Sequence, residues 1–212
     1  MLVLMGKSCS GKTVIAQELV SRYNYKKIVT YTTRPIGSGE TNGIDYYYIS
    51  DEEFDNKVKS GFFAEWKQYN TEQGMWKYGC GMDDILYAPE RSVIILTPAG
   101  VKEIQKHEND QSFIEIVSCY IHANIDVICN RLINRKRGES ANEILRRISA
   151  DALDFENVMD LSDFSVANSG EFDISNVTKF VNEMYYECLY RKTETRINRR
   201  IEVNQNECNN IN

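Results

Sequence analysis

The first residues that could do chemistry lie near the N-terminus, in the segment Gly6-Lys7-Ser8-Cys9-Ser10-Gly11-Lys12-Thr13. This segment matches the pattern GxxxxGK[ST] in full. Glycines let backbone N–H groups wrap a phosphate, because a Cβ would block the turn. The pattern places the Lys12 ammonium at the β- and γ-phosphates and the Thr13 hydroxyl at Mg²⁺. We therefore expect a nucleoside triphosphate site formed by Gly6, Ser8, Ser10, Gly11, Lys12, Thr13 and Val14, with Thr13 as its metal ligand.

The hydrophobic pattern predicts the elements that position this loop. Residues 1–5 are all apolar, which is typical of a buried strand in a parallel sheet. Apolar residues at helical spacing from Val14 to Val20 predict a helix that starts at the loop, so its positive N-terminal end would face the phosphates. A second strand is predicted at 27–31. Strand, glycine loop, helix and strand together form a βαβ unit of an α/β domain.

The rest of the chain predicts a three-layer α/β/α fold with a parallel core sheet, made by residues 1–33 and 88–202. Residues 34–87 alternate short strand-like pieces with glycines and predict a small β-rich lobe inserted in that core. Further core strands are predicted at 93–97, 113–121 and 164–167. Helices are predicted at 51–60, 125–134, 141–157 and from 174 to beyond 190. The segment 203–212 is polar and Asn-rich, and we expect it to be an unstructured tail.

Composition excludes several classes of function. The chain has 31 acidic and 25 basic residues and a net charge of −6, which argues against a broad nucleic-acid or anionic-membrane surface. No apolar run approaches the roughly 20 residues of a membrane span. The six cysteines form no CxxC pair, and only two histidines are present, which disfavours a zinc site. We expect a cytoplasmic protein with reduced thiols, either a monomer or a homodimer.

A second set of motifs follows the phosphate loop. Thr32-Thr33-Arg34-Pro35 precedes Gly39-Glu40-Thr41-Asn42-Gly43-Ile44-Asp45-Tyr46, and then come Phe63-Ala64-Glu65-Trp66 and Lys77-Tyr78-Gly79-Cys80. In this order they resemble the guanylate kinase family, which carries TTR-P, G-E-x-N-G-x-D-Y, an acidic E-W/Y-A-like strand and Y-G-[ST]. The resemblance covers about residues 1–170. It implies a P-loop NTPase fold in which the inserted lobe binds an acceptor nucleotide, with ATP and Mg²⁺ as cofactors.

The resemblance implies a GMP site formed by Thr30, Arg34, Glu40, Tyr46, Glu65, Tyr78 and Cys80. Arg34 can grip a phosphate bidentately, and the Tyr46 and Tyr78 hydroxyls can donate to the same phosphate. Glu65 can accept from both guanine N1–H and the 2-amino group, a donor pair that adenine lacks. Thr30 and Cys80 stand where the family uses hydroxyls, and Glu40 is expected to order the loop around Arg34.

A basic segment between two predicted helices resembles the lid of nucleoside monophosphate kinases, at about residues 131–147. A mobile lid of this kind can spread positive charge over a migrating phosphoryl group. The alternative is a solvated basic helix face. Asn168 falls where the family loop passes the adenine of ATP. The resemblance assigns catalytic roles to Lys12, Arg34, Arg131, Arg135, Arg137 and Arg147.

Several positions depart from the family pattern. Ile95 and Thr97 stand at two acidic positions of a D-x-D-x-Q-G run, so the metal would rest on Thr13, phosphates and water. Gly37 replaces a second phosphate-gripping arginine. About four extra residues, near 71–74, separate Glu65 from Tyr78. Cys80 offers a thiol, a weak donor, in place of a hydroxyl.

These residues predict an enzyme that transfers a phosphoryl group from ATP·Mg²⁺ to GMP or dGMP by in-line displacement. The departures leave open a P-loop kinase for a different phosphorylated acceptor. A third interpretation, a catalytically weak guanylate-kinase-like binding module, has no physical need for the intact Lys12-Thr13 pair.

Overall fold

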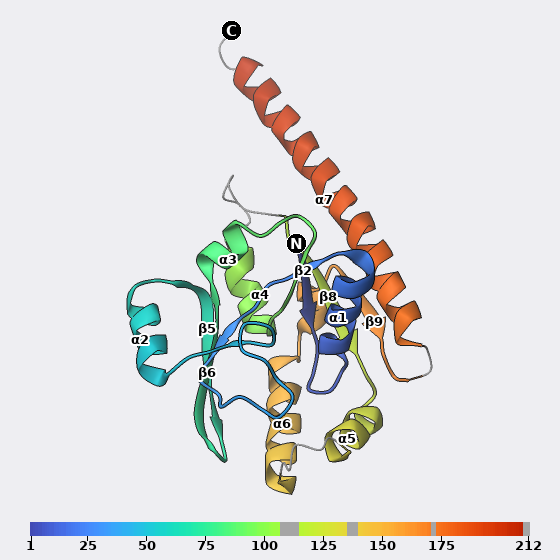
Figure 1. Ribbon diagram of the computed structural model, residues 1–212. Coiled ribbons are helices and arrows are strands. Elements are labelled where there is room, and N and C mark those ends of the chain that lie inside the picture. The colour runs from blue at the N-terminus through green and yellow to red at the C-terminus, as the bar shows by residue number, and fades with distance from the viewer. Residues whose placement is uncertain (107–114, 135–139, 171–172, 210–212) are drawn as a thin grey trace.

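The computed structural model describes residues 1–106, 115–134, 140–170 and 173–209, with the backbone alone for residues 200 and 202–209. Its centre is a parallel sheet of five strands in the order β2-β7-β1-β8-β9 (Figure 1). These strands are β1 (Leu2–Met5), β2 (Lys26–Lys27), β7 (Ser92–Ile95), β8 (Val117–His122) and β9 (Phe164–Ala167). The sheet confirms the predicted α/β class with a parallel core.

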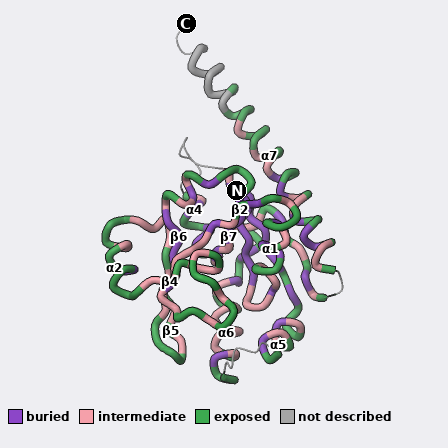
Figure 2. The backbone as a smooth tube through the Cα atoms, viewed as in Figure 1, coloured by how far each residue is buried: buried purple, intermediate pink, exposed green. Residues whose placement is uncertain are grey.

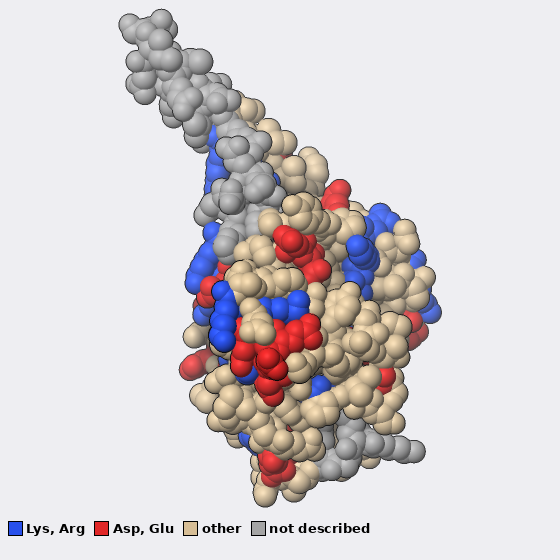
Figure 3. Space-filling model, turned by 60° about the vertical axis from the view of Figure 1, so that its left-hand side comes forward, with Lys and Arg blue, Asp and Glu red and all other residues tan. Residues whose placement is uncertain are grey.

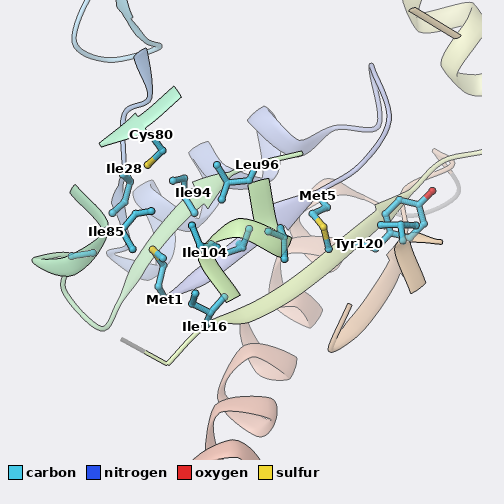
Figure 4. Close-up of a cluster of buried hydrophobic side chains, with 14 of the residues drawn as sticks. Met1, Met5, Ile28, Cys80, Ile85, Ile94, Leu96, Ile104, Ile116 and Tyr120 are labelled. Carbon is cyan, nitrogen blue, oxygen red and sulfur yellow. The ribbon is translucent and has the colours of Figure 1, made fainter. Parts of the chain in front are cut away.

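Strand β1 shows how the sheet is buried on both faces. Leu2 and Leu4 pack with helices α1 (Lys12–Tyr23) and α7 (Ile174–Asn209) on one face. Val3 and Met5 pack on the opposite face, where α4 (Pro98–Gln105) and the 3₁₀ helix η1 (Val158–Leu161) cover the sheet. Met5, Ile94 and Ile104 of this cluster are labelled in Figure 4. Successive side chains of a strand point to opposite faces, so a continuously apolar strand requires two covering layers. The buried, purple tube lies at the centre of the molecule (Figure 2).

A second, smaller sheet forms the inserted lobe, in the strand order β4-β3-β6-β5. Strands β5 (Phe63–Thr71) and β6 (Gly74–Gly81) pair as an antiparallel hairpin, and Gly74 takes the positive φ of 122° that its turn requires. The lobe also contains β3 (Tyr31–Thr32), β4 (Tyr47–Tyr48), α2 (Asp51–Lys59) and α3 (Met82–Leu86).

The predicted strand at 27–31 is divided between the two sheets. Lys26–Lys27 pairs with β7 of the core, whereas Tyr31–Thr32 pairs with β6 of the lobe. The chain thus leaves one sheet and enters the other within a few residues. Helices α3 and α4 were not predicted. Helix α4 nevertheless starts with a local signal, because the Thr97 hydroxyl accepts from the Gly100 N–H and Pro98 occupies the first helical turn.

The predicted lid contains α5 (Ile125–Ile133) and α6 (Ala141–Asp154). Ser140 begins α6 by accepting a hydrogen bond of 3.0 Å from the Glu143 N–H. Arg135 and Arg137, to which we assigned lid roles, lie outside the described residues. In Figure 1, α6 lies between the β5–β6 hairpin and α5.

Helix α7 corrects the expected C-terminal tail. It continues to Asn209, so the prediction of an unstructured chain from residue 203 is wrong for residues 203–209. Lys192 pairs with Asp163 at 3.0 Å and Arg196 with Glu115 at 3.2 Å, beyond which the helix leaves the body (Figure 1). A helix satisfies its backbone hydrogen bonds internally, so a polar segment can be helical even though it buries no side chains in a core.

None of the described helices combines the length and apolar character that a transmembrane segment needs. On the face shown in Figure 3, clusters of Lys and Arg side chains lie beside clusters of Asp and Glu side chains. The described surface in this view therefore has no extended region of only positive or only negative charge.

The core makes a stability prediction. Leu4→Ala should lower the free energy of unfolding by about 2–5 kcal/mol, because Leu4 is fully buried between the sheet and two helices. Ile44→Ala, at a side chain that is 62% exposed, should change it by less than about 0.5 kcal/mol. Urea unfolding measures both values, and similar losses for the two variants would contradict the assigned core.

Candidate active site

A cavity of about 1490 Å³ lies between the core sheet, the inserted lobe and helix α6. The phosphate loop forms one wall, and Arg34, Tyr46, Glu65 and Tyr78 form another. The cavity thus brings together residues more than 60 positions apart that the sequence motifs had selected separately. Other predicted site residues that line it are Thr30, Glu40, Arg131, Arg147 and Asn168.

The phosphate loop has the backbone of an anion cradle. Gly11 has a φ of 102° and Cys9 a φ of 57°, both in the left-handed region. A Cβ on Gly6 would lie 2.4 Å from Ser10 Oγ and 2.7 Å from Ile121 O, so no larger residue fits there. The Lys12 ammonium donates to the carbonyls of Gly6 and Lys7 at 2.7 and 2.9 Å, which holds it over the loop.

One amide of this loop already binds an anionic oxygen. The Ser8 N–H donates to Asp151 Oδ2 of helix α6 at 2.7 Å. This carboxylate oxygen stands in for a phosphate oxygen, because both are anionic acceptors at a loop whose donors point into the cavity. The residues present therefore fit a nucleoside triphosphate.

The metal prediction fits as well, with few protein ligands. Among the described residues, no three His, Cys, Asp or Glu side chains form a metal-binding group. Thr13 lines the cavity directly after Lys12, whereas Thr97 accepts the Gly100 N–H as the N-cap of α4. Mg²⁺ commonly keeps several waters and binds phosphates, so one protein hydroxyl suffices.

On the acceptor side, Glu40 holds Arg34 in a fixed orientation. Arg34 makes two contacts of 2.9 Å with the Glu40 carboxylate, which also accepts from the Gly37 N–H and the Tyr48 hydroxyl at 2.8 Å each. Burial would raise the pKa of Glu40, but the hydrogen bond from Arg34 and its neighbours lower it to about 2. The Arg34 guanidinium lies 5.5 Å from the centre of the Tyr46 ring.

Glu65 is the unusual carboxylate of the cavity. It is partly buried, and no described residue donates a hydrogen bond to its carboxylate. Burial raises the pKa of Glu65 to about 7; the Lys67 ammonium lowers it and the Glu103 carboxylate raises it. A Cβ on Gly100 would lie 3.0 Å from the Glu65 carboxyl carbon, so the start of α4 approaches this group closely. The pocket presents an acceptor that no described residue satisfies.

Arg131 connects two loops of the nucleotide side. It donates to the carbonyls of Cys9 and Asn168 at 3.0 and 3.1 Å. The Asn168 side chain in turn donates to the Ser10 carbonyl at 2.8 Å. Both residues line the cavity and hold the phosphate loop against the end of β9.

Helix α6 carries a cationic pair that one carboxylate organises. Glu143 accepts two hydrogen bonds of 2.8 Å from Arg146 and one of 3.0 Å from Arg147. The hydrogen bond from Arg146 is the main reason that the pKa of Glu143 is lowered to about 2. Both arginines line the cavity.

Of the predicted residues that the structure describes, two do not line the cavity. Cys80 is fully buried in the core beside Ile28 and Ile94, and its thiol donates to the Gly81 carbonyl (Figure 4). Ser10 is also fully buried, and its hydroxyl has no hydrogen-bond partner in the described structure. The sequence pattern placed both by chain position, which does not reveal the depth of a side chain.

Some cavity residues were missed by the sequence prediction. Lys67 and Tyr69 follow Glu65 at alternate positions of β5, so the strand periodicity could have placed them on the same face. No sequence pattern indicated the cavity residues of α6, because their distance from the cavity depends on how this helix packs against the rest of the protein. Among the missed residues are Lys67, Tyr69, Glu143, Asp151 and Asp154.

The parallel sheet, the phosphate loop and the lobe across the cavity define a P-loop NTPase. A family model described as guanylate kinase matches residues 1–184. The chain therefore belongs to the guanylate kinase family of nucleoside monophosphate kinases.

Individual relatives agree with this assignment. A guanylate kinase of Mycoplasmopsis pulmonis is 30% identical over 173 residues, which are 79% of this chain and 85% of that protein. One of Syntrophus aciditrophicus is 29% identical over 148 residues, 69% of this chain and 68% of that protein. The crystal structure of a guanylate kinase from Anaplasma phagocytophilum has a similar fold, with a TM-score of 0.59 and 22% identity over 88% of this chain and 85% of that one.

Burial of Glu65 makes stability depend on pH. Its pKa is about 7 in the folded chain and near the ordinary 4.5 in the unfolded chain, so the folded chain binds the extra proton between these values. The free energy of unfolding should therefore fall as pH rises from 4.5 to 7.5, by about 3 kcal/mol relative to Glu65→Gln. Urea unfolding across this pH range tests it, and parallel profiles for the two proteins would contradict it.

Proposed function

We propose that this protein phosphorylates GMP or dGMP with ATP and Mg²⁺, yielding GDP or dGDP and ADP. The observation that carries the proposal is Glu65, a partly buried carboxylate that accepts no hydrogen bond from the described residues, on the cavity wall opposite the phosphate loop. Guanine N1–H and its 2-amino group would supply two donors at once and so replace the water that this carboxylate loses when a base covers it. Adenine has no such pair, so AMP would leave Glu65 unsatisfied.

In this proposal the lobe holds the acceptor phosphate. Glu40 and the Pro35 carbonyl take three of the guanidinium N–H groups, so Arg34 would bind the phosphate through the others. Tyr46 and Tyr78 would donate their hydroxyls. Thr30 lies in the same wall. Glu40 would act as a positioning residue, because its two contacts fix the plane of the Arg34 guanidinium.

The phosphate loop would hold ATP on the other side. Backbone N–H groups from Gly6 to Val14 would surround the β- and γ-phosphates, Lys12 would add a positive charge, and Thr13 would bind Mg²⁺. The metal neutralises phosphate charge when bound. The acceptor phosphate oxygen can then approach the γ-phosphorus in line, without any histidine or covalent intermediate.

Helix α6 would complete the site at the moment of transfer. Arg147 lines the cavity, and its charge and that of Arg34 both act on the Tyr78 hydroxyl. The two cations thus converge on the place where the acceptor phosphate would lie. Arg131 would position the phosphate loop and the adenine-side loop through its two carbonyl contacts.

One observation favours a different phosphorylated acceptor as the second candidate. Cys80 is buried in the core and bonded to the Gly81 carbonyl, so it offers no donor to guanine O6. The base would then be recognised through Glu65 alone, which weakens the selection of guanine over other bases that carry an adjacent pair of donors.

A turnover assay decides between these functions. The purified protein with ATP·Mg²⁺ should release ADP with GMP and dGMP and not with AMP, CMP or UMP, measured by a coupled enzymatic assay. Turnover with another acceptor would support the second candidate. Binding of nucleotides without any turnover would instead support a binding module and overturn the proposal.

The base-reading role of Glu65 has its own test. Glu65→Gln should raise the KM for GMP by about ten- to a hundredfold and leave the KM for ATP within about twofold, since only the guanine contact is lost. Equal changes in both constants would refute the role.

The same carboxylate should make GMP binding depend on pH. Glu65 must be ionised to accept both guanine donors, and its pKa is about 7. The KM for GMP should therefore be about tenfold higher at pH 6 than at pH 8. The phosphate of GMP titrates too, so the Glu65→Gln variant serves as the control, because the pH dependence of its KM comes from the phosphate. The same pH dependence of KM in the variant and the original protein would contradict the prediction.

A further inference from the structure

The acceptor-phosphate site has little net positive charge from its principal residues. Arg34 is paired bidentately with Glu40, and the tyrosines are neutral at physiological pH. Gly37 cannot add a cation, because a Cβ there would lie 2.8 Å from Glu40 Oε2. A phosphate monoester carries nearly two negative charges near neutral pH, and Arg147 of α6 supplies one cation beside the paired Arg34, so a further cation on the lobe would strengthen the site.

Lys67 is in the right place to supply that charge. It is directly opposite Tyr78 in the β5–β6 ladder, two positions along the strand from Glu65. Directly opposite residues of a ladder share one face, so the Lys67 stem lies beside the Tyr78 ring and on the phosphate side of the base-reading carboxylate. Glu65, Lys67, Tyr69 and Tyr78 all line the cavity. Apart from Arg34, no other described cation of residues 34–87 does so.

The ammonium of Lys67 is held at the cavity rather than in solvent. It donates to Asp154 Oδ1 of helix α6 at 3.0 Å and lies 5.2 Å from the centre of the Tyr69 ring. The Lys67 and Asp154 side chains are 35% and 29% exposed. A partly exposed ion pair of this kind contributes little to stability, so a phosphate can compete with Asp154 for the ammonium. The pair therefore keeps a cation ready at the acceptor site.

We propose that Lys67 binds the phosphate of the acceptor nucleotide together with Arg34, and that Asp154 is its counterion until the nucleotide binds. This inference rests on the proposed function, since it requires an acceptor nucleotide that presents its base to Glu65. The distinct alternative is that Lys67 only joins β5 to α6. In that case removal of either partner of the ion pair has the same effect.

Calorimetric binding of GMP and of guanosine separates the two roles. Lys67→Met keeps the apolar stem and removes the charge. Because the Lys67 ammonium also lowers the pKa of Glu65, binding is measured at pH 9, where Glu65 stays ionised in both proteins. The variant should then weaken GMP binding by about ten- to a hundredfold while guanosine, which has no phosphate, binds as before. Lys67→Arg, which keeps the positive charge, should bind GMP with an affinity within a few-fold of that of the original protein. Lys67→Gln, measured in parallel, provides a second neutral variant should the methionine variant fail to fold.

Asp154→Asn is the matched control, because it breaks the same ion pair and leaves the ammonium. It should bind GMP at least as tightly as the original protein. The inference is overturned if Asp154→Asn weakens GMP binding as much as Lys67→Met does. It is also overturned if the neutral Lys67 variants bind GMP with the affinity of the original protein, or if their affinities for guanosine and GMP fall by the same factor. Failure of the proposed function is a different result: the original protein itself would then show no preference for GMP over other nucleoside monophosphates.

Discussion

The arrangement of the cavity depends on the pairing of partly buried positive charges with carboxylates. Cations that could bind phosphates must be removed from bulk water, and an unpaired charge in such a place is costly. The structure pairs Arg34 with Glu40, the α6 arginines with Glu143, and Lys67 with Asp154. Each ion pair also fixes the orientation of a cationic side chain. The same contacts therefore reduce the cost of burial and orient the proposed phosphate-binding groups.

The parallel sheet determines where these pairs meet. The carboxyl ends of parallel strands lie at one edge, which is where α/β proteins bind their ligands. Strand β1 leads into the phosphate loop, β8 into helix α5 with Arg131, and β9 into Asn168. Because β1 is covered on both faces, its end cannot shift toward either layer without exposing apolar side chains. The loop is therefore held by the core itself, while the lobe and α6 bring their side chains to it.

The features that could be predicted from the sequence are those with a local cause. The phosphate loop, the alternation of β5 and the amphipathic helices follow from neighbouring residues, and the structure contains all of them. Asp151 could not be foreseen at the Ser8 amide, since 143 positions separate them and only the docking of α6 joins them. The depth of Cys80 could not be foreseen for a similar reason. It stands opposite Glu65 in the β5–β6 ladder, but the packing around it buries its thiol in the core.

The uncharged residues Ile95 and Thr97 at the end of β7, where the resemblance leads one to expect acids, also have a structural consequence. Thr97 serves as the N-cap of α4, and Gly100 in the first turn leaves room for the Glu65 carboxylate. The positive end of a helix favours an anion nearby, which offsets part of the cost of burying Glu65. The carboxyl nevertheless keeps a pKa of about 7, so burial exceeds this stabilisation. A carboxylate at either acidic position would add like charge to this region and raise that pKa further. Ile95 and Thr97 therefore help to keep Glu65 ionisable at neutral pH, and an ionised Glu65 is the form that can accept two hydrogen bonds from a guanine base.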